Sequence, residues 1–395
     1  MNPKTKLPKI DHFHFDPILV ISCSALLLIG YIMVTSSSLH IDGKISDNLL
    51  NYPAKQLAHI ILGIVFAKYI AGISLRSWEK IGPWLYILGL FLLVIVLIPG
   101  LGIKVNGSTR WLSLGGIRIQ VSEVIKFASV IYMAGYVNRH QQAILESALG
   151  LLKPLVLFII AGLLLLCEPD MGSAVIIVTI ATGIMFLAGA RLIQFICLII
   201  VLAIVAALLA YIEPYRWGRV TSFINPFQDA KDSGFQLVNA LISFGRGEIF
   251  GVGLGNGVQK LFYLPEAHTD FIFSVIAEEL GLIGVIVIIT LYSVLIWRIF
   301  YLAHLAEQAN DKFAAFVAYG IGIWFGFQTF VNVGVNMGIL PTKGLTLPLM
   351  SYGGGSMIVM CGTLGLLFRV FYEITEHNAS NIPTPRVKAA RAQNV

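Results

Sequence analysis

Stretches of about 20 apolar residues recur along the whole chain, and they limit its fold more than any other feature. A hydrocarbon layer of about 30 Å needs about 20 apolar residues per helix. Because 57% of the residues are hydrophobic and only 12% are charged, we predict an integral membrane protein. Ten predicted spans cover residues 17–36, 54–75, 81–99, 122–138, 151–167, 171–189, 191–211, 271–298, 313–337 and 345–371.

The apolar runs lack the alternation that is typical of a membrane β-barrel. Residues 85–99 and 193–209 are apolar all round, as expected of helices that face lipid or other helices. We therefore expect an all-α polytopic membrane protein with about ten transmembrane helices. The longest connection, residues 212–270, joins the seventh and eighth spans and is predicted to form a large ordered loop with short interfacial helices.

Lysine and arginine indicate the orientation. If the N-terminus is cytoplasmic, the segments on that side carry more of both residues than the outward segments do, which predicts that both termini are cytoplasmic. The net charge of +6 follows from the same bias and from anionic lipid, so no nucleic-acid partner is predicted. We expect an N-terminal tail (1–16), a transmembrane domain (17–372) and a disordered C-terminal tail (373–395).

Titratable residues collect where the eighth span begins. Glu266, His268 and Asp270 lie within five residues of one another, at a boundary where charged groups are costly unless a pathway, a ligand or a reaction uses them. Asp270 has two interpretations. An Asp in the first turn of a helix caps free N–H groups, whereas a carboxylate at the mouth of a cationic pocket accepts a proton from a hydroxyl group. Position alone leaves both open.

The segment between the third and fourth spans carries Arg110, and the fourth span opens with Glu123 and Lys126. Glu123 and Lys126 are three residues apart, so they share a helix face and can neutralise each other. The alternative, which we favour, is that Lys126 faces a phosphate together with Arg110, because a lysine at the centre of a membrane costs about 2.5–3.5 kcal/mol.

The long loop is also rich in basic residues and glycines. Its cations are Arg216, Arg219, Arg246 and Lys260, and we predict that they converge with Arg110 and Lys126 on a substrate with an anionic head and a lipid tail. Solvated surface charge is the alternative for each one. The glycines at 251, 253, 255 and 257 follow no strand, so they are no dinucleotide fingerprint. They are expected to form either a flexible connector or a close approach to a phosphate.

Several sequence motifs run from the first span to the last. They are residues 106–115 (NGSTRWLSLG), Ser122-Glu123 with Lys126, 213–216 (EPYR), 244–248 (FGRGE), 253–255 (GLG), Gln259-Lys260, 264–273 (LPEAHTDFIF), 278–281 (EELG) and 336–354 (NMGILPTKGLTLPLMSYGG). With these motifs the whole chain resembles the SEDS family (shape, elongation, division and sporulation) of membrane glycosyltransferases. The run 341–348 favours the cell-division branch of that family over the elongation branch.

The resemblance implies a chemistry for Asp270. The matching Asp of the family is required to polymerise lipid II, so Asp270 is expected to take the proton of the acceptor N-acetylglucosamine 4-hydroxyl as that oxygen attacks the anomeric carbon of the donor. Inversion gives a β-1,4-linked glycan and releases undecaprenyl pyrophosphate. The expected substrate- and pyrophosphate-binding residues are Arg110, Lys126, Arg216, Arg246, Lys260, Glu266 and His268, and the expected supporting residues are Glu123 and Glu279.

The resemblance also implies partners and a location. We expect an FtsI-like class B penicillin-binding protein, other divisome membrane proteins and membrane lipid as partners, at the division septum of a bacterial cytoplasmic (inner) membrane. No cofactor follows from the sequence, and a divalent cation, Mg²⁺ or Mn²⁺, stays open. Two other functions remain as alternatives: a transporter that flips lipid II, and a non-catalytic divisome scaffold.

Overall fold

The computed structural model of the protein describes residues 15–45, 51–105, 108–114, 117–228, 230, 234–342 and 344–380. The helices are α1 (Pro17–Ile45), α2 (Asn51–Gly72), α3 (Leu75–Leu97), α4 (Val121–Glu146), α5 (Ala148–Cys167), α6 (Met171–Leu187), α7 (Leu192–Ile212), α8 (Pro214–Ile224), α9 (Phe235–Gly247), α10 (Ile272–Gln308), α11 (Lys312–Asn336) and α12 (Gly354–Ser380). Three strands follow α3: β1 (Ile103–Val105), β2 (Ser108–Leu114) and β3 (Ile117–Gln120).

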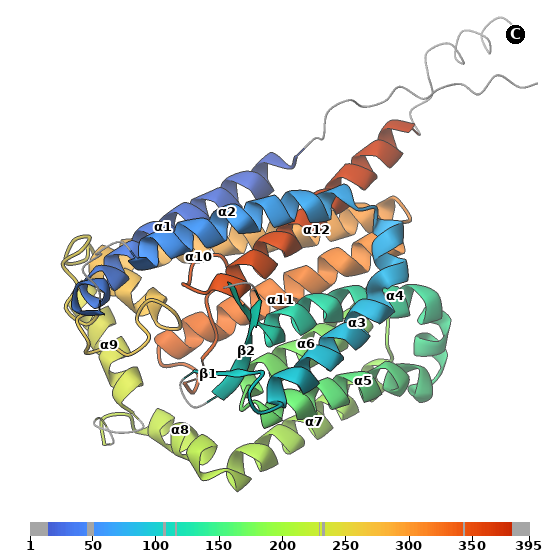
Figure 1. Ribbon diagram of the computed structural model, residues 1–395. Helices are drawn as coiled ribbons and strands as arrows, with labels where there is room; N and C mark the ends of the chain where they lie inside the picture. The colour runs from blue at the N-terminus through green and yellow to red at the C-terminus, as the bar shows by residue number, and fades with distance from the viewer. Residues whose placement is uncertain are drawn as a thin grey trace, which may run out of the picture.

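The helices form one elongated bundle, which confirms the predicted all-α membrane fold. Without water in the bilayer, helices satisfy their own backbone polar groups, so long apolar runs fold this way. Within the described residues, seven helices are long and apolar enough to cross a membrane: α1, α2, α3, α5, α10, α11 and α12. Figure 1 shows that α1 begins and α12 ends at the same end of the bundle, opposite α9, as expected for two termini on one side.

The other three predicted spans correspond to α4, α6 and α7. Helices α6 and α7 are shorter apolar helices, and α4 carries Glu123 and Lys126 in its first two turns. Helix α11 lies at the centre, where it packs against α10, α6 and α4. Its Trp324 and Phe325 are fully buried. A central helix of this kind can hold polar side chains away from lipid, and α11 buries Gln328, Asn332 and Asn336.

Helix α10 is interrupted at Gly281, whose φ of 64° and ψ of −163° are not helical. The loop after α9 fills the break with its own backbone: Val252 and Gly253 donate N–H groups to the carbonyls of Glu278 and Glu279, and two N–H groups of α10 donate back to the loop. The predicted ordered loop is therefore present, with α8 and α9 as its short helices, and it is joined to α10 by main-chain hydrogen bonds.

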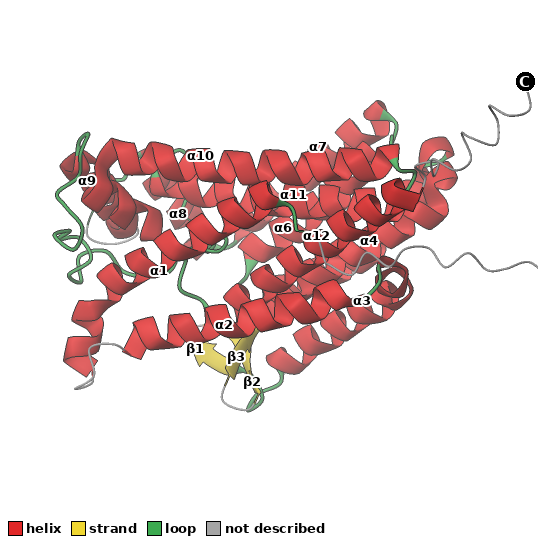
Figure 2. Cartoon of the chain, turned by 90° about the horizontal axis from the view of Figure 1, so that it is seen from above, coloured by secondary structure: helices red, strands yellow, loops and turns green. Residues whose placement is uncertain are grey.

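The segment after α3 forms a small antiparallel sheet in the order β1-β2-β3, which the sequence did not reveal. Figure 2 shows these strands at the edge of a molecule otherwise built of helices. Strand β3 lies against the start of α12, where Gly355 makes the approach possible: a Cβ at Gly355 would lie 2.9 Å from the backbone nitrogen of Gln120. The sheet thereby places β2, which carries Arg110, against α3 and α4.

The predicted start of the tenth span at residue 345 is wrong. Helix α12 begins at Gly354, and residues 345–353 form an irregular segment with a turn at 348–350 instead. Pro348 and Gly353 are poor residues for a continuing helix, and the segment is held by hydrogen bonds to the loop before α10, such as Tyr352 N to His268 O at 2.9 Å. Helix α12 continues to Ser380, past the predicted domain limit at 372, and residues 381–395 lie outside the described part of the chain.

Candidate active site

Asp270 lies directly before α10, and its main chain is anchored. Its carbonyl oxygen accepts hydrogen bonds from Asn332 Nδ2 (2.9 Å) and Asn336 Nδ2 (3.0 Å). Phe271, not Asp270, occupies the N-cap position of α10 and makes no side-chain cap bond, and the N–H of Ser274 in the first turn is accepted by Asn336 Oδ1. The capping interpretation is therefore wrong. The carboxyl group is half-buried, and a Cβ at Gly344 would lie 2.8 Å from its Oδ2, so glycine leaves room for it.

Charged groups from four segments act on Asp270. Burial and, next, the Glu266 carboxylate raise the pKa of Asp270 to about 7, and Asp170 adds to the increase. The guanidinium groups of Arg110 and Arg219 oppose it. A carboxylate with the ordinary pKa of about 3.9 is a weak base at neutral pH, whereas a pKa close to the working pH suits general base catalysis. The surroundings of Asp270 therefore tune it to accept a proton.

Main-chain carbonyls hold the two arginines. Arg110 donates from Nε to Glu168 O (3.0 Å) and from Nη2 to Pro169 O (2.5 Å). Arg219 on α8 donates from Nη1 to Thr342 O at 3.3 Å. The bonds of Arg110 use two of the five N–H donors of a guanidinium, so this group is fixed in place and keeps capacity for an anion. Sequence reasoning counted Arg219 as part of the cationic cap but did not select it for the site.

Two carboxyl groups between α5 and α6 escaped the sequence analysis. Burial, then Asp170, raise the pKa of Glu168 to about 8, and among the described residues neither of its side-chain oxygens has a hydrogen-bond partner. Asp170 caps α6, because its Oδ1 and Oδ2 accept hydrogen bonds from Ser173 N (3.1 Å) and Oγ (2.9 Å). The signal was available: like Asp270, both residues lie between two apolar runs.

Lys126 takes the ion-pair alternative. Its ammonium group is fully buried and donates to Glu123 Oε1 at 2.6 Å. It also donates to Gln328 Oε1 at 3.3 Å and lies 5.6 Å from the centre of the Trp324 ring. Glu123 therefore supports Lys126, and in this arrangement the ammonium faces protein groups. The phosphate-binding role of Lys126 stays a prediction.

Lys260 is also engaged inside the protein. Its Nζ donates to Glu279 Oε1 (2.5 Å), Ser36 Oγ (2.8 Å) and Gly255 O (2.8 Å), which uses the three donors of a lysine. The same Glu279 accepts the N–H of Gly255 and the hydroxyl of Ser36. Lys260 and Glu279 thus fasten the outer loop to α1 and α10, and the predicted substrate contact of Lys260 stays a prediction.

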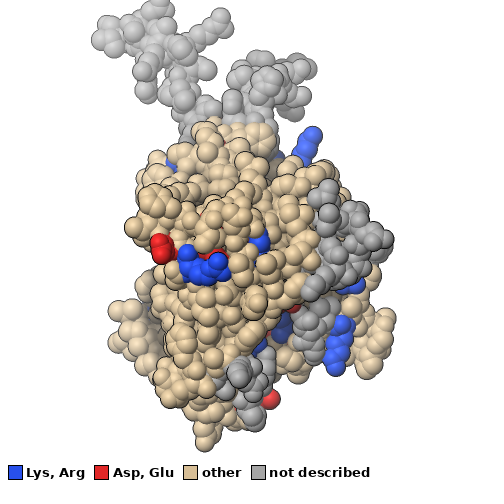
Figure 3. All heavy atoms as spheres, turned by 90° about the vertical axis from the view of Figure 1, so that its left-hand side faces the viewer, with Lys and Arg blue, Asp and Glu red and all other residues tan. Residues whose placement is uncertain are grey.

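Arg246 and the glycines at 251, 253, 255 and 257 also help to join the loop to α10. Arg246, which is partly exposed, lies 3.4 Å from the buried Glu278, and Glu278 accepts the N–H groups of Val258 and Gln259. A Cβ at Gly251 would overlap the carbonyl of Glu279. Within the series, Gly251 thus packs tightly on α10, Gly253 donates its N–H to the Glu279 carbonyl and Gly255 donates its N–H to the Glu279 carboxylate, which neither predicted alternative anticipated. Figure 3 shows this end of the bundle, where Lys and Arg form separate groups on a mostly uncharged surface.

The remaining predicted residues are Glu266 and His268, which precede Asp270 in the same loop, and Arg216 on α8. Glu266 has a left-handed φ of 58° and accepts the Thr269 hydroxyl at 2.7 Å. The His268 ring packs against Tyr52 and Tyr352, with centroids 5.2 and 5.6 Å apart. Arg216 belongs to α8, but its side chain lies outside the described part of the structure. The structure therefore brings Arg110 and Glu266 close enough to act on the Asp270 carboxyl group, whereas His268 packs between two tyrosines.

The open question of a divalent cation stays open. In the part of the chain that the structure describes, no three His, Cys, Asp or Glu side chains are grouped so that they could hold a metal ion.

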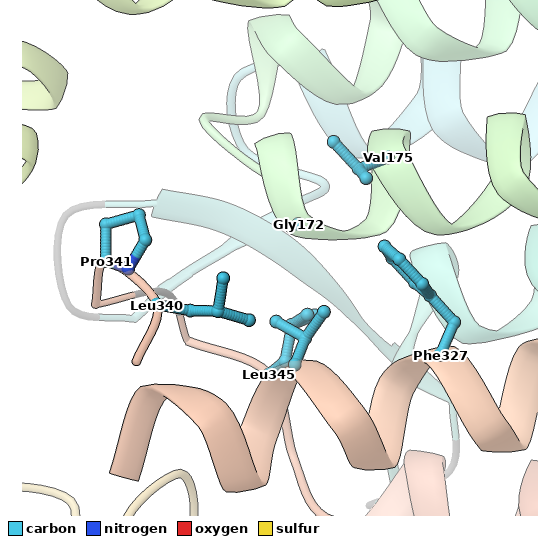
Figure 4. Close-up of a pocket in the computed structure, with 7 residues that line it drawn as sticks. Gly172, Val175, Phe327, Leu340, Pro341 and Leu345 are labelled. Atoms are coloured by element: carbon cyan, nitrogen blue, oxygen red, sulfur yellow. The ribbon is translucent and has the colours of Figure 1, made fainter. Parts of the chain in front are cut away.

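An apolar cavity of about 140 Å³ lies between α6, α11 and the segment after α11. In Figure 4, Val175, Phe327, Leu340 and Leu345 point toward one another across this space. The cavity lies next to the site, because Leu345 follows Gly344, which contacts the Asp270 carboxyl group. The charged surroundings of Asp270, which include two arginines, and an uncharged cavity lining are therefore neighbours in the structure.

Comparison with known proteins gives one consistent result. The family described as "Cell cycle protein" (FtsW, RodA and SpoVE) matches residues 17–376. Two similar relatives are named probable peptidoglycan glycosyltransferase FtsW: that of Methylomonas methanica is 60% identical over 97% of this chain and 99% of its own. That of Methylococcus capsulatus is 52% identical over 91% of this chain and 90% of its own.

Solved structures give the same fold. One chain, from a study of polymerization and crosslinking by a peptidoglycan synthase complex, matches with a TM-score of 0.76 at 27% identity, over 92% of this chain and 99% of that one. The crystal structure of the rod shape determining protein RodA of Thermus thermophilus matches with a TM-score of 0.66 at 26% identity, over 91% and 97% of the two chains.

Proposed function

We propose, because this chain belongs to the FtsW/RodA/SpoVE family of cell cycle proteins, that it is a peptidoglycan glycosyltransferase which polymerises lipid II at the division septum. One observation carries the mechanism: Asp270 is a half-buried carboxyl group with a pKa of about 7 near Arg110 and Arg219. A base matched to neutral pH and two cations are the groups that an inverting transfer from a pyrophosphate needs.

In the proposed reaction, Asp270 accepts the proton of the acceptor 4-hydroxyl while the oxygen forms a bond to the anomeric carbon of the donor sugar. The bond from that carbon to the pyrophosphate oxygen breaks, and its electron pair leaves with undecaprenyl pyrophosphate. Negative charge develops on the leaving group, where Arg110 and Arg219 stabilise it. The cavity beside Leu345 is apolar and has room for only a short part of the lipid chain of such a substrate.

The proposal extends to a partner and a location. A peptidoglycan synthase complex contains a chain of the same fold, so we propose that this protein works with an FtsI-like class B penicillin-binding protein, which crosslinks the new glycan. Both would lie in the bacterial inner membrane with the Asp270 end of this chain in the periplasm, among other divisome proteins.

The transporter alternative loses part of its support. A transporter would need polar residues within the membrane, and α11 carries three of them, namely Gln328, Asn332 and Asn336. Each of these amides donates to a main-chain carbonyl at 2.6–3.0 Å, which gives each of them a structural use that requires no transport pathway.

The test is polymerisation of lipid II by the purified chain together with its class B penicillin-binding protein, whose transpeptidase site is inactivated. The native chain should form glycan and the isosteric Asp270→Asn variant should not. Asn239→Leu, which alters a buried amide on α9, is the matched control and should remain active. Glycan from native and Asp270→Asn chains alike, or transbilayer movement of labelled lipid II by both without polymer, contradicts the proposal.

A further inference from the structure

Helix α11 carries three amide side chains on one face. Gln328, Asn332 and Asn336 are spaced four residues apart, so they lie one above another along the helix. Their exposed fractions are 0%, 2% and 0%. Buried amides are costly unless their hydrogen bonds are satisfied, so their partners reveal what this stripe does.

The partners are two chain segments that meet at the site. Asn332 Nδ2 donates to Leu345 O (2.6 Å) and to Asp270 O (2.9 Å). Asn336 Nδ2 donates to Asp270 O (3.0 Å), and its Oδ1 accepts the N–H (3.1 Å) and the hydroxyl (2.7 Å) of Ser274 in the first turn of α10. Asn332 therefore bridges the two segments, while Asn336 joins the Asp270 carbonyl to the start of α10.

The second segment also contacts the Asp270 carboxyl group. Gly344 lies so close that a Cβ there would be 2.8 Å from Oδ2, and Gly344 directly precedes Leu345, whose carbonyl Asn332 holds. Holding the Asp270 carbonyl restrains the main chain from which its side chain projects, and holding the Leu345 carbonyl restrains the wall against the carboxyl group. One side chain, Asn332, thus acts on both ends of the same residue.

We propose that Asn332 and Asn336 are positioning residues for the glycosyl transfer: they orient the Asp270 carboxyl group through its own main chain and through the wall formed by Gly344 and Leu345. This inference rests on the proposed function. A displacement of about 1 Å at a reacting group can lower a rate by about 100-fold. Removing the Asn332 amide is therefore expected to act on kcat, because binding of lipid II elsewhere on the protein does not require it.

The experiment compares Asn332→Leu with the native chain and with Asn239→Leu, whose amide nitrogen donates to Phe235 O on its own helix. We expect Asn332→Leu to lower kcat by about 10- to 100-fold with KM within about twofold of native. We also expect the pH midpoint of kcat/KM to shift, because the surroundings of Asp270 set that midpoint. A merely structural role lowers the amount of folded protein and leaves the midpoint unchanged.

A second variant covers the case in which Asn332→Leu does not fold. Gly344→Ala adds one methyl group against the Asp270 carboxyl group and is expected to lower kcat and shift the same midpoint. If the folded fraction of Asn332→Leu has the native kcat and the native pH midpoint of kcat/KM, the positioning role is wrong while the proposed function stands. If only Gly344→Ala folds, the same result in that variant has the same meaning. If the native chain forms no glycan, both proposals are wrong.

Discussion

Asp270 supplies the most direct prediction, which concerns the pH dependence of the reaction. Its raised pKa of about 7 means that about 9% of the molecules hold the ionised base at pH 6 and about 91% at pH 8. Below the pKa, kcat/KM should fall tenfold per pH unit, and the total change from pH 6 to pH 8 should be about tenfold. With an ordinary pKa of about 3.9, the base would be ionised throughout this range and the profile would be flat.

Glu266 provides the matched variant for this prediction. Its carboxylate is the second cause, after burial, of the raised pKa of Asp270. Glu266→Gln removes the negative charge and keeps an oxygen that can accept the Thr269 hydroxyl. The midpoint of the profile should therefore move to lower pH. Arg110→Gln removes a positive charge that lowers the pKa, so its midpoint should move to higher pH.

The assay measures initial rates of glycan formation between pH 5.5 and 8.5 at lipid II concentrations well below KM, with the partner transpeptidase site inactivated. Under these conditions kcat/KM reports groups of the free enzyme. Added viscogen should leave the rate unchanged, which shows that diffusion does not limit it. A flat native profile between pH 6 and pH 8, or a Glu266→Gln midpoint above that of the native chain, would refute the reasoning.

Three further outcomes concern stability. The folded-state pKa of Asp270 lies above its ordinary value of 3.8, so the native chain loses stability as pH rises from about 4 to about 7, and Asp270→Asn should melt at a higher temperature at pH 8 but not at pH 4. Lys260→Met leaves the buried Glu279 carboxylate without its cation and should lower the free energy of unfolding by about 3–5 kcal/mol. The double variant Lys260→Met/Glu279→Gln should recover most of that loss. An equal loss of unfolding free energy in the single and the double variant contradicts this expectation. Gly355→Ser should lower the melting temperature, because the β3 backbone lies 2.9 Å from the added Cβ. The control Gly353→Ala should lower it less, because its added Cβ meets only an ordinary contact at 3.4 Å. Equal melting temperatures of the two variants count against the packing argument.

The membrane architecture could be predicted from the sequence because a bilayer leaves an apolar run of 20 residues little choice of structure. Asp270 could be found in the same way, since a carboxylate at the start of such a run stands out against its neighbours. The same criterion would have found Glu168 and Asp170, which lie between two spans. The break in α10 was hidden, because Gly281 in an apolar run also fits a continuous helix.

The partners of the buried cations could not be predicted, because they are set by contacts between distant segments. Lys260 meets Ser36, which is 224 residues away in the chain, and Lys126 meets Gln328 across 202 residues. The small sheet escaped for a different reason: its strands are three to seven residues long, and an antiparallel sheet this small has little stability of its own. It is held by the helices on which it packs.

The interruption of α10 at Gly281 has a practical consequence for labelling the outer face. Residues 248–253 supply and receive the main-chain hydrogen bonds that the interrupted helix lacks. Replacing an exposed side chain such as that of Phe250 leaves those bonds intact, whereas a Cβ at Gly251 would overlap the carbonyl of Glu279, and adding or deleting a single residue shifts all of the bonds out of register. An epitope or fluorophore intended to report on this enzyme in living cells should therefore be attached by substitution at an exposed position such as Phe250, and never by insertion.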